Sequence, residues 1–178
     1  MARKKKQAID ELRAVMSRLR APDGCPWDQE QDHRSIRLNA VEEVYELVDA
    51  IEAGDDEEML EELGDLLLQV VFHAQMADER GAFDFDDIAQ TITDKLIRRH
   101  PHVFGDAKVK DVDGVWNQWD AIKQTEKVGT ANERKSAFDG IPRHLPALMR
   151  AHEVAKKGRK HGFLPKGRRG GAKSALGK

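Results

Sequence analysis

Two pairs of acidic residues have the spacing that could build a metal site: Glu43 with Glu46, and Glu62 with Asp65. The members of each pair are three residues apart in a segment with helical periodicity, so their carboxylates lie on neighbouring parts of one helical face. Two such helices packed antiparallel bring four carboxylates together, and these repel unless they are protonated or bind a cation. Oxygen ligands suit Mg²⁺ or Mn²⁺. The pattern therefore indicates a helical, Mg²⁺-dependent enzyme acting on a phosphate ester or anhydride.

Both pairs have the same position relative to the apolar residues of their helices. With about 100° of rotation per residue, an apolar arc from roughly 40° to 160° lies beside Glu43, and Glu46 falls near −60°. An equivalent arc lies beside Glu62, and Asp65 again falls near −60° by the same rotation of about 100° per residue. The first arc comprises Val41, Val44, Leu47, Val48 and Ile51, and the second Met59, Leu63, Leu66, Leu67 and Val70. Stripes of this kind face a protein core, so the pairs should lie along the edge of a buried face.

A solvated helix face is the alternative interpretation of these acids, because 35% of the chain is charged. Two acidic pairs at equivalent edges, on helices joined by the short segment Ala53-Gly54-Asp55-Asp56, favour a metal site over isolated surface acids. The pattern alone leaves both interpretations open.

Length and composition fit one globular domain, or one domain with an extension, since the chain has 178 residues of which 39% are hydrophobic. The net charge of −2 gives no global indication of nucleic-acid binding. No run of 18 apolar residues predicts a membrane span, and the basic N-terminus leads into a charged amphipathic segment rather than a signal sequence. The single cysteine, Cys25, excludes an internal disulfide and is compatible with a reducing compartment. We therefore expect a cytoplasmic protein without membrane partners.

The apolar periodicity predicts an all-α protein, because no segment alternates as a strand does. Loops are expected at 21–32 and 105–114, where prolines, glycines or polar residues interrupt the pattern. No glycine-rich phosphate loop or dinucleotide fingerprint is present, so phosphate handling would rest on metal and cations. The expected helices span residues 7–20, 35–52, 57–79, 86–99, 115–127 and 147–157.

Three cations end the helix expected at 86–99: Lys95, Arg98 and Arg99. Cations at a helix C-terminus interact favourably with its dipole, which is one explanation for them. The other is phosphate neutralisation beside a metal site, because carboxylates cannot hold a polyphosphate themselves. Of the tryptophans at 116 and 119, one is expected in the core and the other at the border of a pocket.

Four motifs together resemble the MazG nucleoside triphosphate pyrophosphohydrolases, over roughly residues 8–127. The two acidic motifs are shared with the wider all-α NTP pyrophosphatase group, which includes enzymes acting on dCTP, dUTP and phosphoribosyl-ATP. The first and last motifs narrow the resemblance to MazG. In chain order the motifs are Cys25-Pro26-Trp27-Asp28, Glu42-Glu43-x-x-Glu46, Glu61-Glu62-x-x-Asp65 and Lys95-x-x-Arg98-Arg99-His100-Pro101-His102-Val103-Phe104.

The resemblance implies a helical bundle that dimerises and cleaves NTP or dNTP to the monophosphate and pyrophosphate with Mg²⁺, or Mn²⁺ as a substitute. Carried over by motif, the metal ligands would be Glu43, Glu46, Glu62 and Asp65. Glu42 and Glu61 would lie beside them as groups that orient or deprotonate the water. Lys95, Arg98 and Arg99 would contact phosphates, with Lys95 also supporting catalysis, and Trp119 would line the nucleotide site.

The C-terminal part departs from the longer family members, which carry two MazG domains in tandem. We expect a MazG-like domain at 1–130, then a linker and short helix at 131–157 that resemble the start of a second domain. Residues 158–178 would form a basic disordered tail, because residues 156–178 contain nine Lys or Arg and no acid. Only this tail is a candidate for nucleic-acid contact.

Two other functions stay open beside broad hydrolysis. A catalytically weak helical module could bind nucleotides or a protein partner through the basic tail. An enzyme could also be narrow for one dNTP. The residues do not identify the base, because aromatic contacts such as that of Trp119 tolerate many bases.

Overall fold

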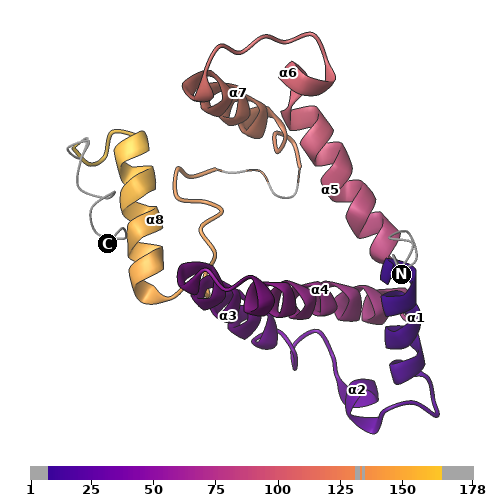
Figure 1. Ribbon diagram of the computed structural model, residues 1–178. Helices are drawn as coiled ribbons and strands as arrows, with labels where there is room; N and C mark the ends of the chain where they lie inside the picture. Colours follow the sequence, from indigo (N-terminus) through magenta and orange to yellow (C-terminus); the bar gives the residue numbers. More distant parts are fainter. Residues whose placement is uncertain (1–7, 131–132, 134, 166–178) are drawn as a thin grey trace. The chain divides into compact units, whose positions relative to one another are not determined.

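A computed structural model describes residues 8–130, 133 and 135–165 of the chain, and every regular element among them is a helix (Figure 1). The predicted all-α class is therefore confirmed. No helix in this described part is both long and apolar enough to cross a membrane. The helices are α1 Ala8–Arg20, α2 Pro26–Glu30, α3 Asn39–Ala53, α4 Asp56–Asp78, α5 Phe85–Arg99, α6 Pro101–Phe104, α7 Val112–Thr125 and α8 Ala147–Lys160.

The chain divides into two compact units, residues 1–98 and 99–178. In the first unit α3 packs along α4, and α1 packs on both α4 and α2. In the second unit the chain folds back on α8, where the amides of Phe163 and Leu164 donate to the carbonyl of Gly158. The predicted domain boundaries at residues 130 and 157 stay predictions.

The hydrophobic core of the first unit lies where α1 and the loop before α3 meet the second half of α4. Its buried side chains are Met16, Ile36, Val71, Phe72 and Met76. The second half of α4 is thus covered on several sides, whereas its first half contacts α3. One helix therefore serves two purposes, with the core around its second half and the acidic motif in its first half.

A two-residue connection joins α3 to α4. Gly54 ends α3 in the left-handed conformation, with φ of 69°, which glycine adopts without steric cost. Asp55 then caps α4, its side chain accepting hydrogen bonds from the amides of Glu57 and Glu58. The predicted short turn is confirmed, and α4 begins and ends within one residue of its predicted bounds.

Two short helices lie where the sequence predicts none. Pro26 opens α2 inside the loop expected at 21–32, and Pro101, the proline expected to end the preceding helix, opens α6. Proline lacks an amide hydrogen and has a fixed φ, so it suits the first turn of a helix as well as it stops one. Trp27 on α2 contacts Phe72 edge-on, with 6.3 Å between ring centroids, while 55% of it stays exposed.

Other helix ends differ by a few residues from the predicted ones. Side-chain and backbone turns occupy 33–38, so α3 begins at Asn39 rather than Ser35. Asp111 caps α7 by accepting from the amide of Gly114, which moves the start to Val112. The last helix, α8, continues to Lys160, and residues 166–178 of the predicted tail lie outside the described residues.

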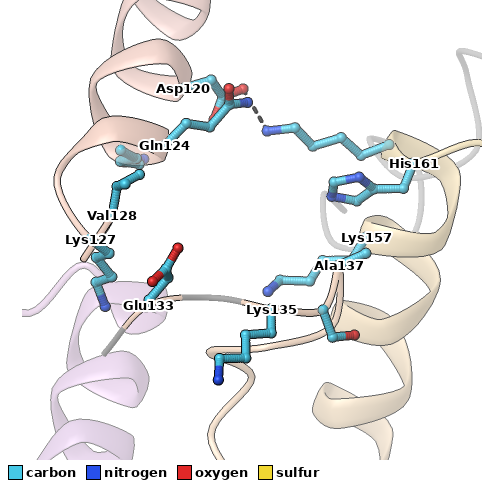
Figure 2. A pocket seen from close by; sticks show the side chains of 12 residues that line it. Asp120, Gln124, Lys127, Val128, Glu133, Lys135, Ala137, Lys157 and His161 are labelled. Atoms are coloured by element: carbon cyan, nitrogen blue, oxygen red, sulfur yellow. Dashed lines mark ion pairs between the residues drawn. The ribbon is translucent and has the colours of Figure 1, made fainter. Parts of the chain in front are cut away.

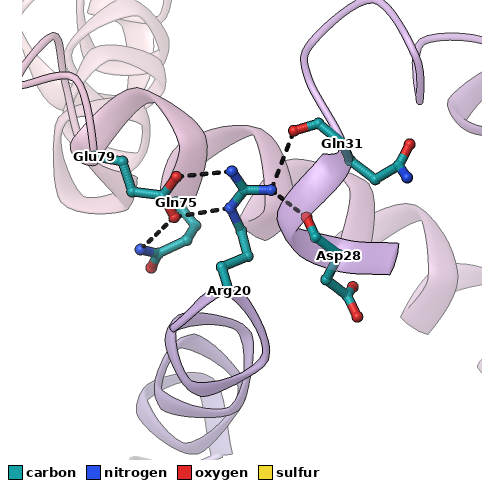
Figure 3. Close-up of polar contacts among 5 residues, drawn as sticks. All are labelled: Arg20, Asp28, Gln31, Gln75 and Glu79. Carbon is teal, nitrogen blue, oxygen red and sulfur yellow. Dashed lines mark hydrogen bonds and ion pairs between the residues drawn. The ribbon is translucent and has the colours of Figure 1, made fainter. Parts of the chain in front are cut away.

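Arg20 joins α1, α2 and α4 (Figure 3). Its guanidinium forms two hydrogen bonds of 2.8 Å with the Glu79 carboxylate and also donates to the carbonyls of Asp28 and Gln31. The Arg20 side chain is only 9% exposed, and its guanidinium carbon lies 5.5 Å from the Phe72 ring centroid. The hydrogen bond from Arg20 lowers the pKa of Glu79.

We expect Arg20→Ala to lower the free energy of unfolding by about 2 kcal/mol, because it removes a guanidinium side chain that is only 9% exposed and leaves the Glu79 carboxylate and two carbonyls without their donor. Urea unfolding followed by circular dichroism measures this. Arg18→Ala is the matched control: Arg18 also makes a two-pronged pair, with Asp23, but both side chains are exposed. The control should change stability by no more than about 0.5 kcal/mol. Equal losses in both variants would contradict the role given to Arg20.

Candidate metal site and nucleotide contacts

Three acidic side chains meet between α3 and α4. Glu43 of α3, and Glu62 and Asp65 of α4, each offer one carboxylate oxygen within 4.8 Å of the others. All three are half-buried. The predicted convergence of acids from two helices is thus present for three of the four proposed ligands. Glu46 is exposed and lies outside this triad, although its negative charge contributes to the raised pKa values of Glu43 and Glu62.

The triad lies within the helix contact and not at the edge of an apolar face. On α3 the more buried residues are Glu43, Leu47 and Ala50, which fall in an arc of about 60°. The predicted core-facing stripe is wrong for the single chain, because most of it stays uncovered: Val41, Val44, Val48 and Ile51 of α3, with Leu63 and Leu67 of α4, are between 40% and 54% exposed. The physical reason is that α3 turns the side that carries Glu43, Leu47 and Ala50 toward α4, so its aliphatic stripe lies outside this helix contact.

Burial and mutual repulsion both act on these carboxylates. Burial raises the pKa of Glu43, and the charges of Asp65 and Glu46 raise it further, while a hydrogen bond from Gln69 opposes them. Burial is also the largest cause of the raised pKa of Glu62, followed by Glu46, Asp65, Glu43 and Glu61. A site that disfavours negative charge on several oxygens at once gains from a bound cation.

The donor set fits a hard divalent cation. Carboxylate oxygens are the ligands that Mg²⁺ and Mn²⁺ take in proteins. The Oε2 atom of Glu62 is buried and has no hydrogen-bond partner among the described residues, so it is an acceptor in need of a donor or a cation. The residues of the triad can therefore hold such an ion.

Glu42 and Glu61, the predicted water-orienting groups, are both exposed. The Glu61 charge contributes to the raised pKa of Glu62, which shows that it lies within electrostatic reach of the triad. Lys95 is half-buried on α5, where it borders a shallow hollow of about 440 Å³ with Phe83, Asp87, Ile88, Thr91 and Ile92.

Arg98 is exposed, whereas Arg99 is tied to a carboxylate of the second unit. Arg99 pairs with Glu126, with 2.6 Å between Nη2 and Oε2 and 3.1 Å between Nε and Oε1. This hydrogen-bonded pair raises the pKa of Arg99. A phosphate bound by Arg99 would therefore compete with Glu126.

Trp119 lies among aromatic and basic groups of the second unit. Its ring is edge-on to His100 and Trp116, with centroid distances of 5.1 and 5.2 Å. The Lys123 ammonium lies 5.6 Å from the same ring centroid. Trp119 is half-buried and Trp116 exposed, so neither is fully buried in a core. The Trp119 Nε1 donor is buried without a partner in the described part of the chain.

The sequence analysis did not identify two residues that contact members of these candidate sites. Gln69 donates a hydrogen bond to Glu43. Its position four residues after Asp65 could have predicted that it shares a helical face with the acids. Lys123, four residues after Trp119, also lines a cavity of about 400 Å³ between the end of α7, residues 133 and 135–137, and α8 (Figure 2). This cavity has four further lysines, and Lys160 forms an ion pair of 2.6 Å with Asp120 across it.

The all-helical fold and the half-buried carboxylate triad define a helical protein with a candidate divalent-metal site. A comparison of the sequence with known families narrows this class, because residues 31–104 match the MazG nucleotide pyrophosphohydrolase domain. This segment is a MazG domain, and the resemblance found from the motifs of the chain is confirmed. The matched segment includes the triad, Glu46 and the cations at the end of α5.

Relatives of known name cover most of this chain. It is 51% identical over 156 residues to the nucleoside triphosphate pyrophosphohydrolase of Escherichia coli, with 87% of this chain and 59% of that protein aligned. It is 46% identical over 155 residues to the nucleoside triphosphate pyrophosphohydrolase/pyrophosphatase MazG of Thermotoga maritima, with 87% and 58% aligned. A Mycobacterium tuberculosis nucleoside triphosphate pyrophosphohydrolase is 40% identical over 84% of the chain. The chain thus spans less than two thirds of the length of these relatives.

The raised pKa values predict how pH and Mg²⁺ should act together on stability. Because the folded state holds the Glu43 and Glu62 protons more tightly than the unfolded state, ionising them costs stability as pH rises above the usual glutamate pKa of about 4.3. A cation that binds the ionised triad removes this cost. We expect Mg²⁺ to raise the thermal midpoint more at about pH 8 than at about pH 5. Differential scanning fluorimetry measures this, and an Mg²⁺ effect independent of pH would contradict it.

Proposed function

We propose that this protein hydrolyses nucleoside triphosphates, ribo or deoxy, to the nucleoside monophosphate and pyrophosphate, with Mg²⁺ held by Glu43, Glu62 and Asp65. Mn²⁺ is a possible substitute. The observation that carries the proposal is the half-buried carboxylate triad inside the segment that matches the MazG domain. The names of the E. coli and Thermotoga relatives support the same reaction class. The purpose proposed is nucleotide pool sanitation or turnover.

The proposed chemistry divides between the cation and the side chains. When bound, Mg²⁺ would neutralise phosphate charge, lower the pKa of a water and stabilise the pyrophosphate leaving group. Glu43, Glu62 and Asp65 would hold it, with Glu46 as a fourth ligand from the solvent side. Glu42 or Glu61 would orient the attacking water and accept its proton, which an exposed carboxylate beside the triad can pass to solvent.

The cations are proposed to bind the substrate's phosphates. Lys95 and Arg98 supply positive charge that the triad lacks, and Arg99 would exchange its pairing with Glu126 for a pairing with phosphate. Lys95 would also stabilise the charge that develops on the leaving group. Trp119 would contact the base.

A homodimer is proposed as the assembly. The stripe of Val41, Val44, Val48 and Ile51 on α3 is aliphatic, continuous over several turns and uncovered in the single chain. A two-fold axis would place this stripe against its own copy, which needs no complementary chemistry from another protein. Aliphatic burial of this kind drives most stable association.

Glu62→Gln tests the metal site. It keeps the size of the side chain but removes a charge from the triad, so we expect kcat/KM to fall by at least about 100-fold, equivalent to several kcal/mol of transition-state stabilisation. Pyrophosphate release from a panel of NTPs and dNTPs, with Mg²⁺ or with EDTA, is the assay. Glu52→Gln, an exposed acid on α3 outside the triad, is the control and should keep full activity. Full activity of Glu62→Gln would refute the metal-site assignment, and a wild-type protein inactive on every substrate would favour a binding module instead.

Val48→Asp tests the dimer. A charge at the centre of the α3 stripe should convert a dimer to a monomer, because the ionised group would lose its hydration in the interface. Light scattering after size-exclusion chromatography reports the molar mass. Leu148→Asp on α8, where the leucine is 87% exposed, is the control and should leave the mass unchanged. A monomeric wild-type protein at micromolar concentration would contradict the assembly.

A further inference from the structure

Gln69 is a buried polar residue next to the carboxylate triad. It lies on α4 four residues after Asp65 and seven after Glu62, so all three share one face of the helix. Its side chain is 8% exposed, and its Nε2 atom lies 3.4 Å from Oε1 of Glu43 on α3. The contact therefore crosses the same helix interface that brings the triad together.

The orientation of the Gln69 amide follows from its surroundings. A carboxylate only accepts hydrogen bonds, so the amide must turn its NH₂ group, and not its oxygen, toward Glu43. The remaining Gln69 oxygen is buried and has no partner among the described residues. A buried amide with one unsatisfied atom lowers stability compared with an apolar side chain of similar size. Packing alone thus gives no reason for glutamine at this position, whereas its donor does.

We propose that Gln69 is a positioning residue for the divalent-cation site: its amide donor fixes the rotation of the Glu43 carboxylate so that an oxygen faces Glu62 and Asp65. This inference rests on the proposed function, since it assumes that the triad binds a metal. A carboxylate held by a donor behind it is already oriented when the cation arrives, so less freedom is lost on binding. Without the donor, repulsion from Glu62 and Asp65 would turn the Glu43 carboxylate away.

Gln69→Met is the variant that separates positioning from structural support. Methionine has a similar length and no donor, and it removes the unsatisfied oxygen from the interior. Gln75→Met is the matched control, because Gln75 lies on the same helix and donates, at 3.1 Å, to the carboxylate of Glu79 outside the triad. Both variants lose one amide–carboxylate hydrogen bond of α4, but only one of these bonds reaches the proposed ligands.

The readout is Mn²⁺ binding, measured from the electron paramagnetic resonance signal of the free ion, together with the thermal midpoint of the metal-free protein. We expect Gln69→Met to raise the Mn²⁺ dissociation constant about 10-fold while the metal-free midpoint stays the same or rises. Gln75→Met should leave the dissociation constant unchanged. In the activity assay, the Mg²⁺ concentration at half-maximal rate should rise for Gln69→Met, while the rate at saturating Mg²⁺ stays close to that of the wild type.

Each other outcome overturns a stated claim. If the wild type binds Mn²⁺ and Gln69→Met binds it equally well, the positioning role is wrong and the proposed function is untouched. If Gln69→Met instead loses thermal stability without a change in Mn²⁺ affinity, Gln69 is purely structural. A wild type that binds no Mn²⁺ refutes the proposed metal site, and the role of Gln69 with it.

A measurement on the wild type covers the case in which Gln69→Met fails to fold. The side-chain amide of Gln69 can be followed by ¹⁵N NMR as Mg²⁺ is added. We expect its hydrogens to exchange slowly with water and its signals to shift on Mg²⁺ addition more than those of Gln75. Rapid exchange with no shift, while Mg²⁺ visibly perturbs the backbone of the triad, would overturn the proposal.

Discussion

The packing of α3 on α4 has one electrostatic consequence from which the other features of the site follow. The contact withdraws Glu43, Glu62 and Asp65 from water and brings their oxygens within 4.8 Å of one another. Burial and like charge both oppose ionisation there, which is why the pKa values of Glu43 and Glu62 are raised. The hairpin therefore carries an excess of negative charge at the triad, which a hard cation bound there would compensate. Among the described residues of the hairpin, the hydrogen bond from Gln69 to Glu43 opposes this effect.

The rest of the first unit holds this hairpin in place without taking part in it. Arg20 ties α1 and the α2 segment to the second half of α4 through Glu79. The core around Val71 and Phe72 fills the same half of the helix. The packed second half of α4 fixes the direction of that helix. The turn at Gly54 and Asp55 fixes where α3 ends and where α4 begins its return along α3. The acids of the two helices can meet because both ends of the hairpin are anchored.

The sequence predicted the helices of this hairpin well. Glycine and aspartate at the turn are strong local signals, and the apolar residues of both helices keep helical spacing over several turns. The short helices α2 and α6 were missed, since a proline at the first turn of a helix reads as a breaker. The stripe on α3 was assigned to the core because periodicity identifies an apolar face but not the partner that covers it. Gln69 was missed because its contact with Glu43 depends on packing across two helices, which spacing along one helix does not contain. Lys123 was missed although its position four residues after Trp119 on α7 was a local signal.

The core side chains Met16, Ile36, Val71, Phe72 and Met76 include none of the carboxylates, cations or aromatic residues assigned to chemistry. Substitution at the triad therefore leaves the scaffold's apolar packing intact, and relieving repulsion between buried carboxylates can even strengthen it. Natural variation can then change the ligands or the substrate contacts one residue at a time without first unfolding the chain. This separation makes the hairpin a part of the protein that evolution can modify for new phosphate chemistries on an unchanged frame.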